Sequence, residues 1–263
     1  MNLTIDIGNT NVMICIFKNN RIIKHEKLNV ISFSKKDQYN FFKKLFLKYE
    51  ILNIVISSVV PKISESFFEI FKKLKVDYLQ VQNLLKICKL KTNIKNKSSI
   101  GDDRLINVIY AKHLFVKSKV IIDFGTATTI DVLDKKGVYD GGVITPGIDL
   151  SLKSLQMGTA KLPLVNFKKT NSIVGKSTKD AIQSGFFWGY VSMIQGLIHK
   201  IQLEKKTEFQ IILTGGNSKF FKGCFENVIN IDEYFNSKGL IFLANTYFKK
   251  LLIIQKKIFY ICL

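Results

Sequence analysis

The chain has 263 residues and is 47% hydrophobic, so it is globular and long enough to bury one large core or two modest ones. Its net charge of +20 is strongly basic, but the lysines are spread along the chain without interleaved aromatic residues, which argues against nucleic acid as a partner. No apolar run reaches the roughly 18 residues of a membrane helix, and no signal peptide is indicated. The four cysteines lack metal-ligand spacing and are interpreted as small buried side chains of a cytoplasmic protein.

The first hundred residues alternate between patterns typical of strands and of helices. We expect strands at 3–7, 12–17 and 21–23, a helix at 34–49, a strand at 53–58, a helix at 61–74, a strand at 78–81 and a connecting loop at 85–99. The helix at 61–74 begins with Pro61, whose missing amide is harmless at that position.

The remainder continues the alternation. We expect a helix from 100 to about 115, strands at 120–124, 129–133 and 138–139, a glycine-rich turn at 140–147, a helix at 148–156, a loop at 158–163, a helix at 179–202, a strand at 209–213 and a last helix at 239–250. Three glycines of the helix at 179–202 would let another helix pack closely against it: Gly185, Gly189 and Gly196.

Two segments repeat one supersecondary unit. Asp6 ends a short β-branched strand and is followed by Ile7 and Gly8, and Asp123 ends a similar strand and is followed by Phe124 and Gly125. Each then continues into a strand, a tight turn and a further strand. The sequence therefore predicts a duplicated α/β fold with halves at 1–110 and 111–263.

Three turns of small residues follow strands: Gly8-Asn9-Thr10, Gly125-Thr126 and Gly215-Gly216. Glycine lets backbone amides approach a bulky anion, and the ends of strands are where α/β sheets bind ligands. A carboxylate beside such a turn suits a cation and phosphates. We therefore expect a bound nucleotide.

The stretch Gly101-Asp102-Asp103-Arg104 opens a predicted helix and adds what phosphoryl transfer needs. A carboxylate can accept the proton of an attacking hydroxyl, and an arginine can grip a carboxylate or phosphate with two hydrogen bonds. By itself, the tetrapeptide fits an acidic helix start with a surface arginine equally well.

Together these motifs resemble the type III pantothenate kinases of the acetate kinase, sugar kinase, hsp70 and actin superfamily. The resembling stretches cover nearly the whole chain: 6–11, 101–104, 123–129, 141–147, 158–163, 175–178, 214–216, 238–240 and Asn245. The resemblance implies two ribonuclease H-like halves with mixed β-sheets flanked by helices. It also implies ATP-dependent phosphorylation of pantothenate, the first step of coenzyme A synthesis, by a cytoplasmic homodimer.

The resemblance also implies roles for individual residues. Asp103 would be the catalytic proton acceptor, and Asp123 would bind the monovalent cation, K⁺ or NH₄⁺. Mg²⁺ would accompany ATP near Asp6. ATP would be bound by Asp6, Ile7, Gly8, Asn9, Thr10, Asn11, Val12, Met13 and Thr126, and pantothenate by Gly101, Asp102, Asp103, Arg104 and Thr178.

The sequence departs from the family at Asp102, where alanine is usual. A carboxylate beside Asp103 is expected to repel its charge, unless the two side chains point apart on the helix. Three alternatives remain: an accessory transcriptional regulator, a degenerate kinase-like binding protein, and a kinase of the same superfamily with another substrate.

Overall fold

The computed structural model describes residues 1–30, 34–86, 88 and 90–261, with the backbone alone for 249–261. The chain forms two compact units, one of Met1–Leu90, Asn96–Tyr110 and Asn236–Leu263, the other of Lys91–Lys95 and Ala111–Phe235. Each unit has its own five-stranded sheet. In the described part of the chain, no helix is long and apolar enough to span a membrane.

The sheet of the first unit has the strand order β3-β2-β1-β4-β5. Its strands are β1 (Asn2–Ile7), β2 (Asn11–Lys18), β3 (Arg21–Asn29), β4 (Asn53–Ser58) and β5 (Leu79–Gln80). The helices are α1 (Lys35–Lys48), α2 (Pro61–Leu74), α3 (Val81–Leu85), α4 (Asp102–Leu114) and α7 (Phe235–Ile261), with a short 3₁₀ helix η1 (Lys97–Ser99). Strand β1 is antiparallel to β2 and parallel to β4.

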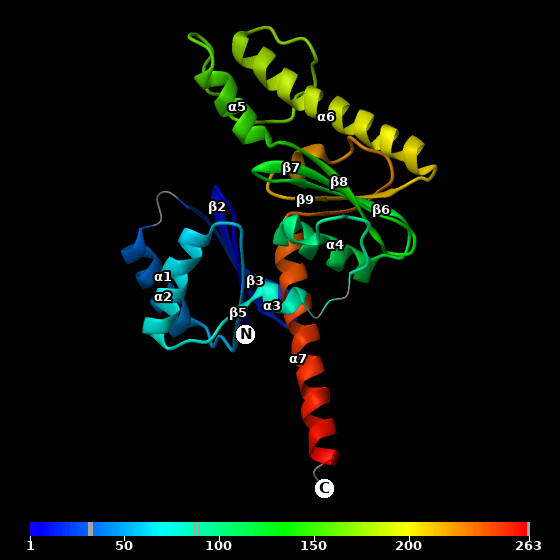
Figure 1. Ribbon diagram of the computed structural model, residues 1–263. Helices are drawn as coiled ribbons and strands as arrows, with labels where there is room; N and C mark the ends of the chain where they lie inside the picture. The colour runs from blue at the N-terminus through cyan, green and yellow to red at the C-terminus, as the bar shows by residue number, and fades with distance from the viewer. Residues whose placement is uncertain (31–33, 87, 89, 262–263) are drawn as a thin grey trace. The chain divides into compact units, whose positions relative to one another are not determined.

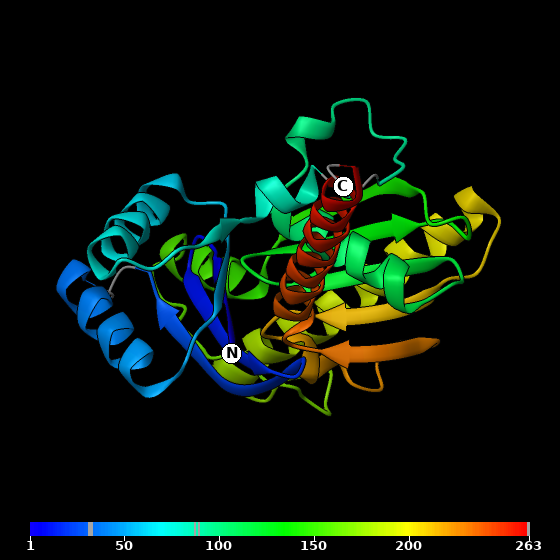
Figure 2. The ribbon, with the colours of Figure 1, turned by 90° about the horizontal axis from the view of Figure 1, so that it is seen from below.

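The two faces of this sheet differ because side chains alternate along a strand. Leu3, Ile5 and Ile7 point to an apolar cluster shared with buried phenylalanines of α1 and α2, which lie side by side in Figures 1 and 2. Asp6 points to the opposite face. On that face the Cys15 thiol donates to the Ser237 hydroxyl of α7 at 3.6 Å.

The second sheet has the order β10-β9-β6-β7-β8. Its elements are β6 (Lys119–Phe124), β7 (Ala127–Leu133), β8 (Tyr139–Pro146), α5 (Ile148–Met157), α6 (Thr178–Lys205), β9 (Gln210–Thr214), η2 (Ser218–Phe221) and β10 (Val228–Asp232). An apolar cluster joins one sheet face to α5 and α6. In reverse, this order is β8-β7-β6-β9-β10, and it matches the order β3-β2-β1-β4-β5 of the first sheet. In each sheet the central strand carries the motif aspartate, with two antiparallel strands on one side and two parallel strands on the other. The predicted duplication is confirmed.

Several elements differ from the prediction. The glycine-rich segment expected as a turn is β8, because its backbone pairs with β7 from Ala127 to Leu133. The turn after Thr214 leads into the four-residue η2, an element that was not predicted. The strand β10 was not predicted, and α7 begins at Phe235, four residues before the expected start at 239.

The division into units also differs from halves at 1–110 and 111–263. The segment 91–95 groups with the second unit, since the residue Thr92 bridges to Tyr139 of β8. Helix α7 groups with the first unit, where Gly239 packs closely against Ile106 of α4.

The cysteines are free thiols wherever the structure describes them. Cys15 is fully buried, as predicted, whereas Cys88 and Cys224 are half-buried. The fourth, Cys262, lies outside the described residues.

Candidate active site

The first predicted turn connects β1 to β2 at the carboxyl end of β1. The Gly8 amide donates to the Asn11 carbonyl at 3.0 Å, which closes the turn over Asn9 and Thr10. Asn9 is exposed, and Asp6 is half-buried opposite Met13 of β2. Ile7 and Val12 are fully buried in the apolar cluster, so these two can offer a ligand only backbone groups.

The stretch from Gly101 to Arg104 leads into α4, which begins at Asp102, within two residues of the predicted helix start. The Asp103 carboxylate accepts a hydrogen bond from the Arg104 amide at 2.8 Å. A side chain at position 101 would meet that carboxylate, since its Cβ would lie 2.5 Å from Asp103 Oδ1. Glycine at 101 therefore gives the Asp103 carboxylate the space it occupies.

The neighbouring Asp102 has a different partner. Its Oδ2 accepts a hydrogen bond from Nε2 of Gln82, a residue of α3, at 2.5 Å. Burial raises the pKa of Asp102 above its ordinary value of 3.8, the charge of Asp103 adds to the rise, and the Gln82 hydrogen bond opposes it. The two carboxylates thus have separate hydrogen-bond partners, although their charges repel.

The first turn of α7 joins these parts of the first unit. Asn236 Nδ2 donates to the Asp103 carbonyl at 3.1 Å and to Asn107 Oδ1 at 3.3 Å. The next residue, Ser237, accepts from Cys15 on the sheet face that carries Asp6. Adjacent residues of α7 therefore contact both the strand beside Asp6 and the backbone of Asp103. Neither Gln82 nor Asn236 was predicted, because both lie far from residues 101–104 in sequence and in no motif.

In the second unit, the Asp123 carboxylate lies between two glycines. A Cβ on Gly215 would stand 2.4 Å from Asp123 Oδ1, and one on Gly125 would stand 3.6 Å from the same atom. Gly215 also has φ +85°, a conformation that glycine adopts without strain. Asp123 is opposite Thr214, so the predicted approach of the second and third turns is present in this unit.

Gly147 completes this group. Its amide donates to the Thr126 carbonyl at 3.0 Å. A Cβ at position 147 would stand 2.3 Å from the carbonyl oxygens of both Gly125 and Thr126. The exposed turn at 125–126 therefore packs directly against the backbone of Gly147, where no side chain larger than hydrogen fits.

Thr178 lies elsewhere in the second unit, as the first residue of α6. Ser177 caps this helix by accepting from the Asp180 amide at 3.1 Å. Thr178 is not among the residues that line the pocket of about 310 Å³ near the start of α6. These are Lys168, Lys169, Thr170, Asn171, Ser172, Val174, Gly175, Lys176 and Asp180. Three lysines against one aspartate make this pocket attractive to an anionic group.

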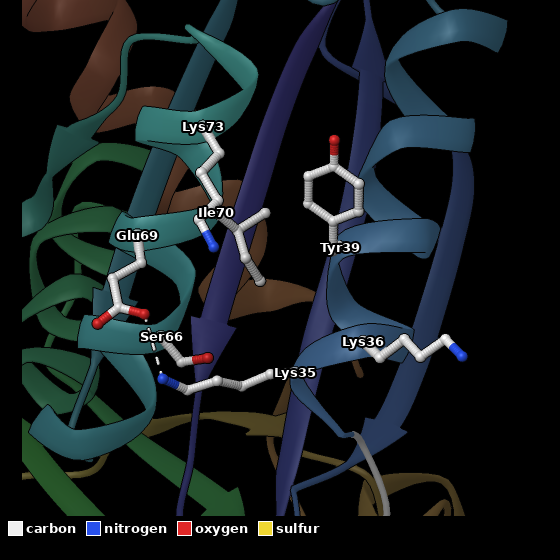
Figure 3. Close-up of a pocket in the computed structure, with 7 residues that line it drawn as sticks. All are labelled: Lys35, Lys36, Tyr39, Ser66, Glu69, Ile70 and Lys73. Atoms are coloured by element: carbon white, nitrogen blue, oxygen red, sulfur yellow. Dashed lines mark hydrogen bonds and ion pairs between the residues drawn. The ribbon is translucent and has the colours of Figure 1, made fainter.

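Another pocket, of about 530 Å³, lies between α1 and α2 (Figure 3) and contains none of the predicted residues. It is lined by Lys35, Lys36, Tyr39, Ser66, Glu69, Ile70 and Lys73. Lys35 and Glu69 form an exposed ion pair at 3.1 Å, and the figure shows the side chains of Lys36 and Tyr39 extending away from that pair. We assign this pocket no catalytic role.

The described residues contain no cluster of three or more histidine, cysteine or acidic side chains that could hold a metal ion alone. Mg²⁺ does not need one, since it keeps several waters and is commonly held by one or two carboxylates together with substrate phosphates. Single carboxylates at strand ends, such as Asp6, fit that mode of binding.

Comparisons with known proteins identify the family of the chain. The sequence model of the family described as type III pantothenate kinase matches residues 2–200. A type III pantothenate kinase of Pelagibacter ubique is 39% identical over 247 residues, which cover 90% of this chain and 95% of the relative.

Two solved structures share the fold. One, from Campylobacter jejuni, assigned to the Baf family of transcriptional activators, has a TM-score of 0.60 and 21% identity over 93% of this chain and 98% of its own. The other, from Sinorhizobium meliloti, described as a 2-dehydro-3-deoxygalactonokinase, has a TM-score of 0.58 and 12% identity over 94% of this chain and 99% of its own. At these identities the likeness concerns the fold alone, and it confirms the predicted fold of two α/β halves.

Proposed function

Because the chain belongs to the type III pantothenate kinase family, we propose that it carries out that family's reaction with Asp103 as the proton acceptor. The enzyme phosphorylates pantothenate with ATP, which gives 4′-phosphopantothenate at the start of coenzyme A synthesis. The pantothenate hydroxyl oxygen bonds to the γ-phosphorus while the bond from that phosphorus to the leaving oxygen of ADP breaks. The hydroxyl proton goes to the Asp103 carboxylate.

The observation that carries this role is how firmly Asp103 is held. Its side chain accepts from the Arg104 amide and its carbonyl accepts from Asn236, so both its carboxylate and its backbone have fixed partners. A carboxylate has lone pairs beyond one such bond and keeps acceptor capacity for a substrate hydroxyl. Arg104 binds the substrate through hydrogen bonds from its guanidinium group. Gly101 leaves the space that the Asp103 carboxylate occupies.

The remaining roles follow the family motifs. Residues Asp6 to Met13 and Thr126 bind ATP, the exposed turn at 8–10 through its amides and hydroxyl groups. Asp6 holds Mg²⁺, which neutralises phosphate charge when bound. Asp123 binds the monovalent cation, K⁺ or NH₄⁺. Support comes from the position of the Asp123 carboxylate between Gly125 and Gly215, because neither glycine places a side chain against it.

Thr178 and the lysine-lined pocket near the start of α6 receive the carboxylate end of pantothenate. The support is electrostatic, because Lys168, Lys169 and Lys176 line that pocket and the substrate is an anion.

The enzyme acts as a cytoplasmic homodimer. Support for a dimer comes from α6, where Gly185, Gly189 and Gly196 are exposed and no atom outside their own helix lies within 4 Å of where a side chain would stand. Such a surface admits close approach of another helix.

The role of Asp103 is tested by Asp103→Asn in a coupled assay of ADP release. We expect kcat to fall by about 10²–10⁴, while a non-hydrolysable ATP analogue binds with unchanged affinity. Asp37→Asn is the matched control, since Asp37 is likewise an acidic residue in the first turn of a helix, α1, and its kcat should change less than about threefold. Full activity of Asp103→Asn would remove the proposed base.

A further inference from the structure

The hydroxyl group of Ser57 lies in the sheet interior without a partner. Ser57 is 0% exposed, and among the described residues its Oγ has no hydrogen-bond partner. Buried hydroxyls are nearly always hydrogen-bonded, because an unmade bond leaves the cost of removing the group from water uncompensated. An unpartnered one therefore needs an explanation.

The position of Ser57 supplies one. Strands β1 and β4 are parallel, with Asp6 directly opposite Ser57. Residues opposite each other in a sheet point to the same face, so the hydroxyl and the Asp6 carboxylate are neighbours at the carboxyl ends of the two strands. Ligands of α/β sheets bind at that edge.

The other half repeats this pairing. Thr214 ends β9 and lies directly opposite Asp123 of β6, in the same parallel arrangement, and is 1% exposed. A buried hydroxyl residue therefore stands one strand away from the motif aspartate in both halves. Since the strand orders of the two sheets match, this recurrence belongs to the duplicated unit itself.

We propose that Ser57 is a positioning residue that works with Asp6 to hold the water shell of the Mg²⁺ that accompanies ATP. A serine hydroxyl can donate to a carboxylate and accept from a metal-bound water at the same time. Mg²⁺ retains several waters when it is held by one carboxylate and phosphates, and a hydroxyl beside that carboxylate can accept a hydrogen bond from one of them. The proposal rests on the role proposed above for Asp6.

Thr4 provides a matched control on the same strand face. It is also 0% exposed, and among the described residues its Oγ1 likewise has no hydrogen-bond partner. It stands two residues before Asp6, opposite Val55 and Cys15, away from the carboxyl end of the sheet. Thr4→Val removes an equally buried hydroxyl at a position where no ligand is expected.

The test is calorimetric titration of a non-hydrolysable ATP analogue into the whole protein, with and without Mg²⁺. Wild type should bind more tightly when Mg²⁺ is present. Ser57→Ala should lose about five- to tenfold of this enhancement, keep its affinity without Mg²⁺, and keep or raise the Tm of the ligand-free protein. Thr4→Val should keep the whole enhancement.

An enhancement equal in Ser57→Ala and wild type would overturn the role of Ser57. An equal loss in Thr4→Val would also overturn it, since the effect would then follow from hydroxyl burial in general. Pantothenate-dependent ADP release by wild type, measured in parallel, separates the two proposals: if it persists, the proposed function stands even when the inference about Ser57 fails.

Discussion

The glycine at position 147 should be irreplaceable because of the turn it touches. In Gly147→Ala the new Cβ would start 2.3 Å from two carbonyl oxygens, and Cβ contacts shorter than 3.0 Å are essentially never seen. The turn of Gly125 and Thr126 must therefore move by at least about 0.7 Å, because backbone cannot rotate away as a side chain can. Overpacking of this kind typically costs about 1–3 kcal/mol.

Two measurements report this shift. The Tm should fall by about 2–4 °C for each kcal/mol lost in a chain of this size. The KM for ATP should rise at least tenfold, since Thr126 is proposed to contact ATP and a displacement of about 1 Å in a site can cost about 10² in rate. Differential scanning calorimetry and steady-state kinetics would measure the two effects.

Gly158 provides the control at the other end of the same helix, α5. A Cβ there would lie 3.2 Å from the carbonyl oxygen of Ser154, a close contact that a shift of a few tenths of an ångström relieves. The φ of −83° at position 158 suits alanine. Gly158→Ala should therefore leave KM unchanged. If Gly147→Ala behaves like Gly158→Ala in both assays, the argument that the turn is clamped by residue 147 is wrong.

Three further predictions concern charge and assembly. Burial raises the pKa of Asp102 above 3.8, so ionisation of this carboxyl destabilises the folded chain at neutral pH. Asp102→Asn should therefore have a higher Tm than wild type at pH 7. This difference in Tm should shrink to nothing as the pH falls through the raised pKa to below 3.8. A Tm gain that grew on acidification would contradict this sign. Asp123→Asn should abolish the advantage of K⁺ over Na⁺ in the kinase assay, whereas an intact K⁺ response would place the cation elsewhere. Gly189→Leu should shift sedimentation from dimer to monomer, and an unchanged dimer would exclude that face of α6.

Much of the fold followed from local pattern. The strand at 53–58 and the helix at 61–74 match β4 and α2, because short β-branched runs and Pro61 at a helix start are strong local signals. Strand β8 (Tyr139–Pro146) was missed, since glycines at 141 and 142 and the pair Pro146-Gly147 are typical of turns. Pairing with β7 outweighs these propensities.

The candidate site likewise contains residues that the sequence could predict and residues that it could not. Asp6, Asp103 and Asp123 could be predicted as candidate site residues because each lies in a compact motif two positions from a glycine. Asn236 and Gln82 could not, because their hydrogen bonds to Asp103 and Asp102 join segments distant in sequence. Such partners depend on how helices and loops pack, which a motif does not encode.

The most direct test of the central claim is ³¹P NMR of purified protein with ATP, Mg²⁺, K⁺ and pantothenate. We predict a phosphomonoester signal that grows in step with ADP, that is absent without pantothenate, and that Asp103→Asn reduces at least a hundredfold. Release of inorganic phosphate in place of the phosphomonoester, or a rate indifferent to pantothenate, would contradict the assignment.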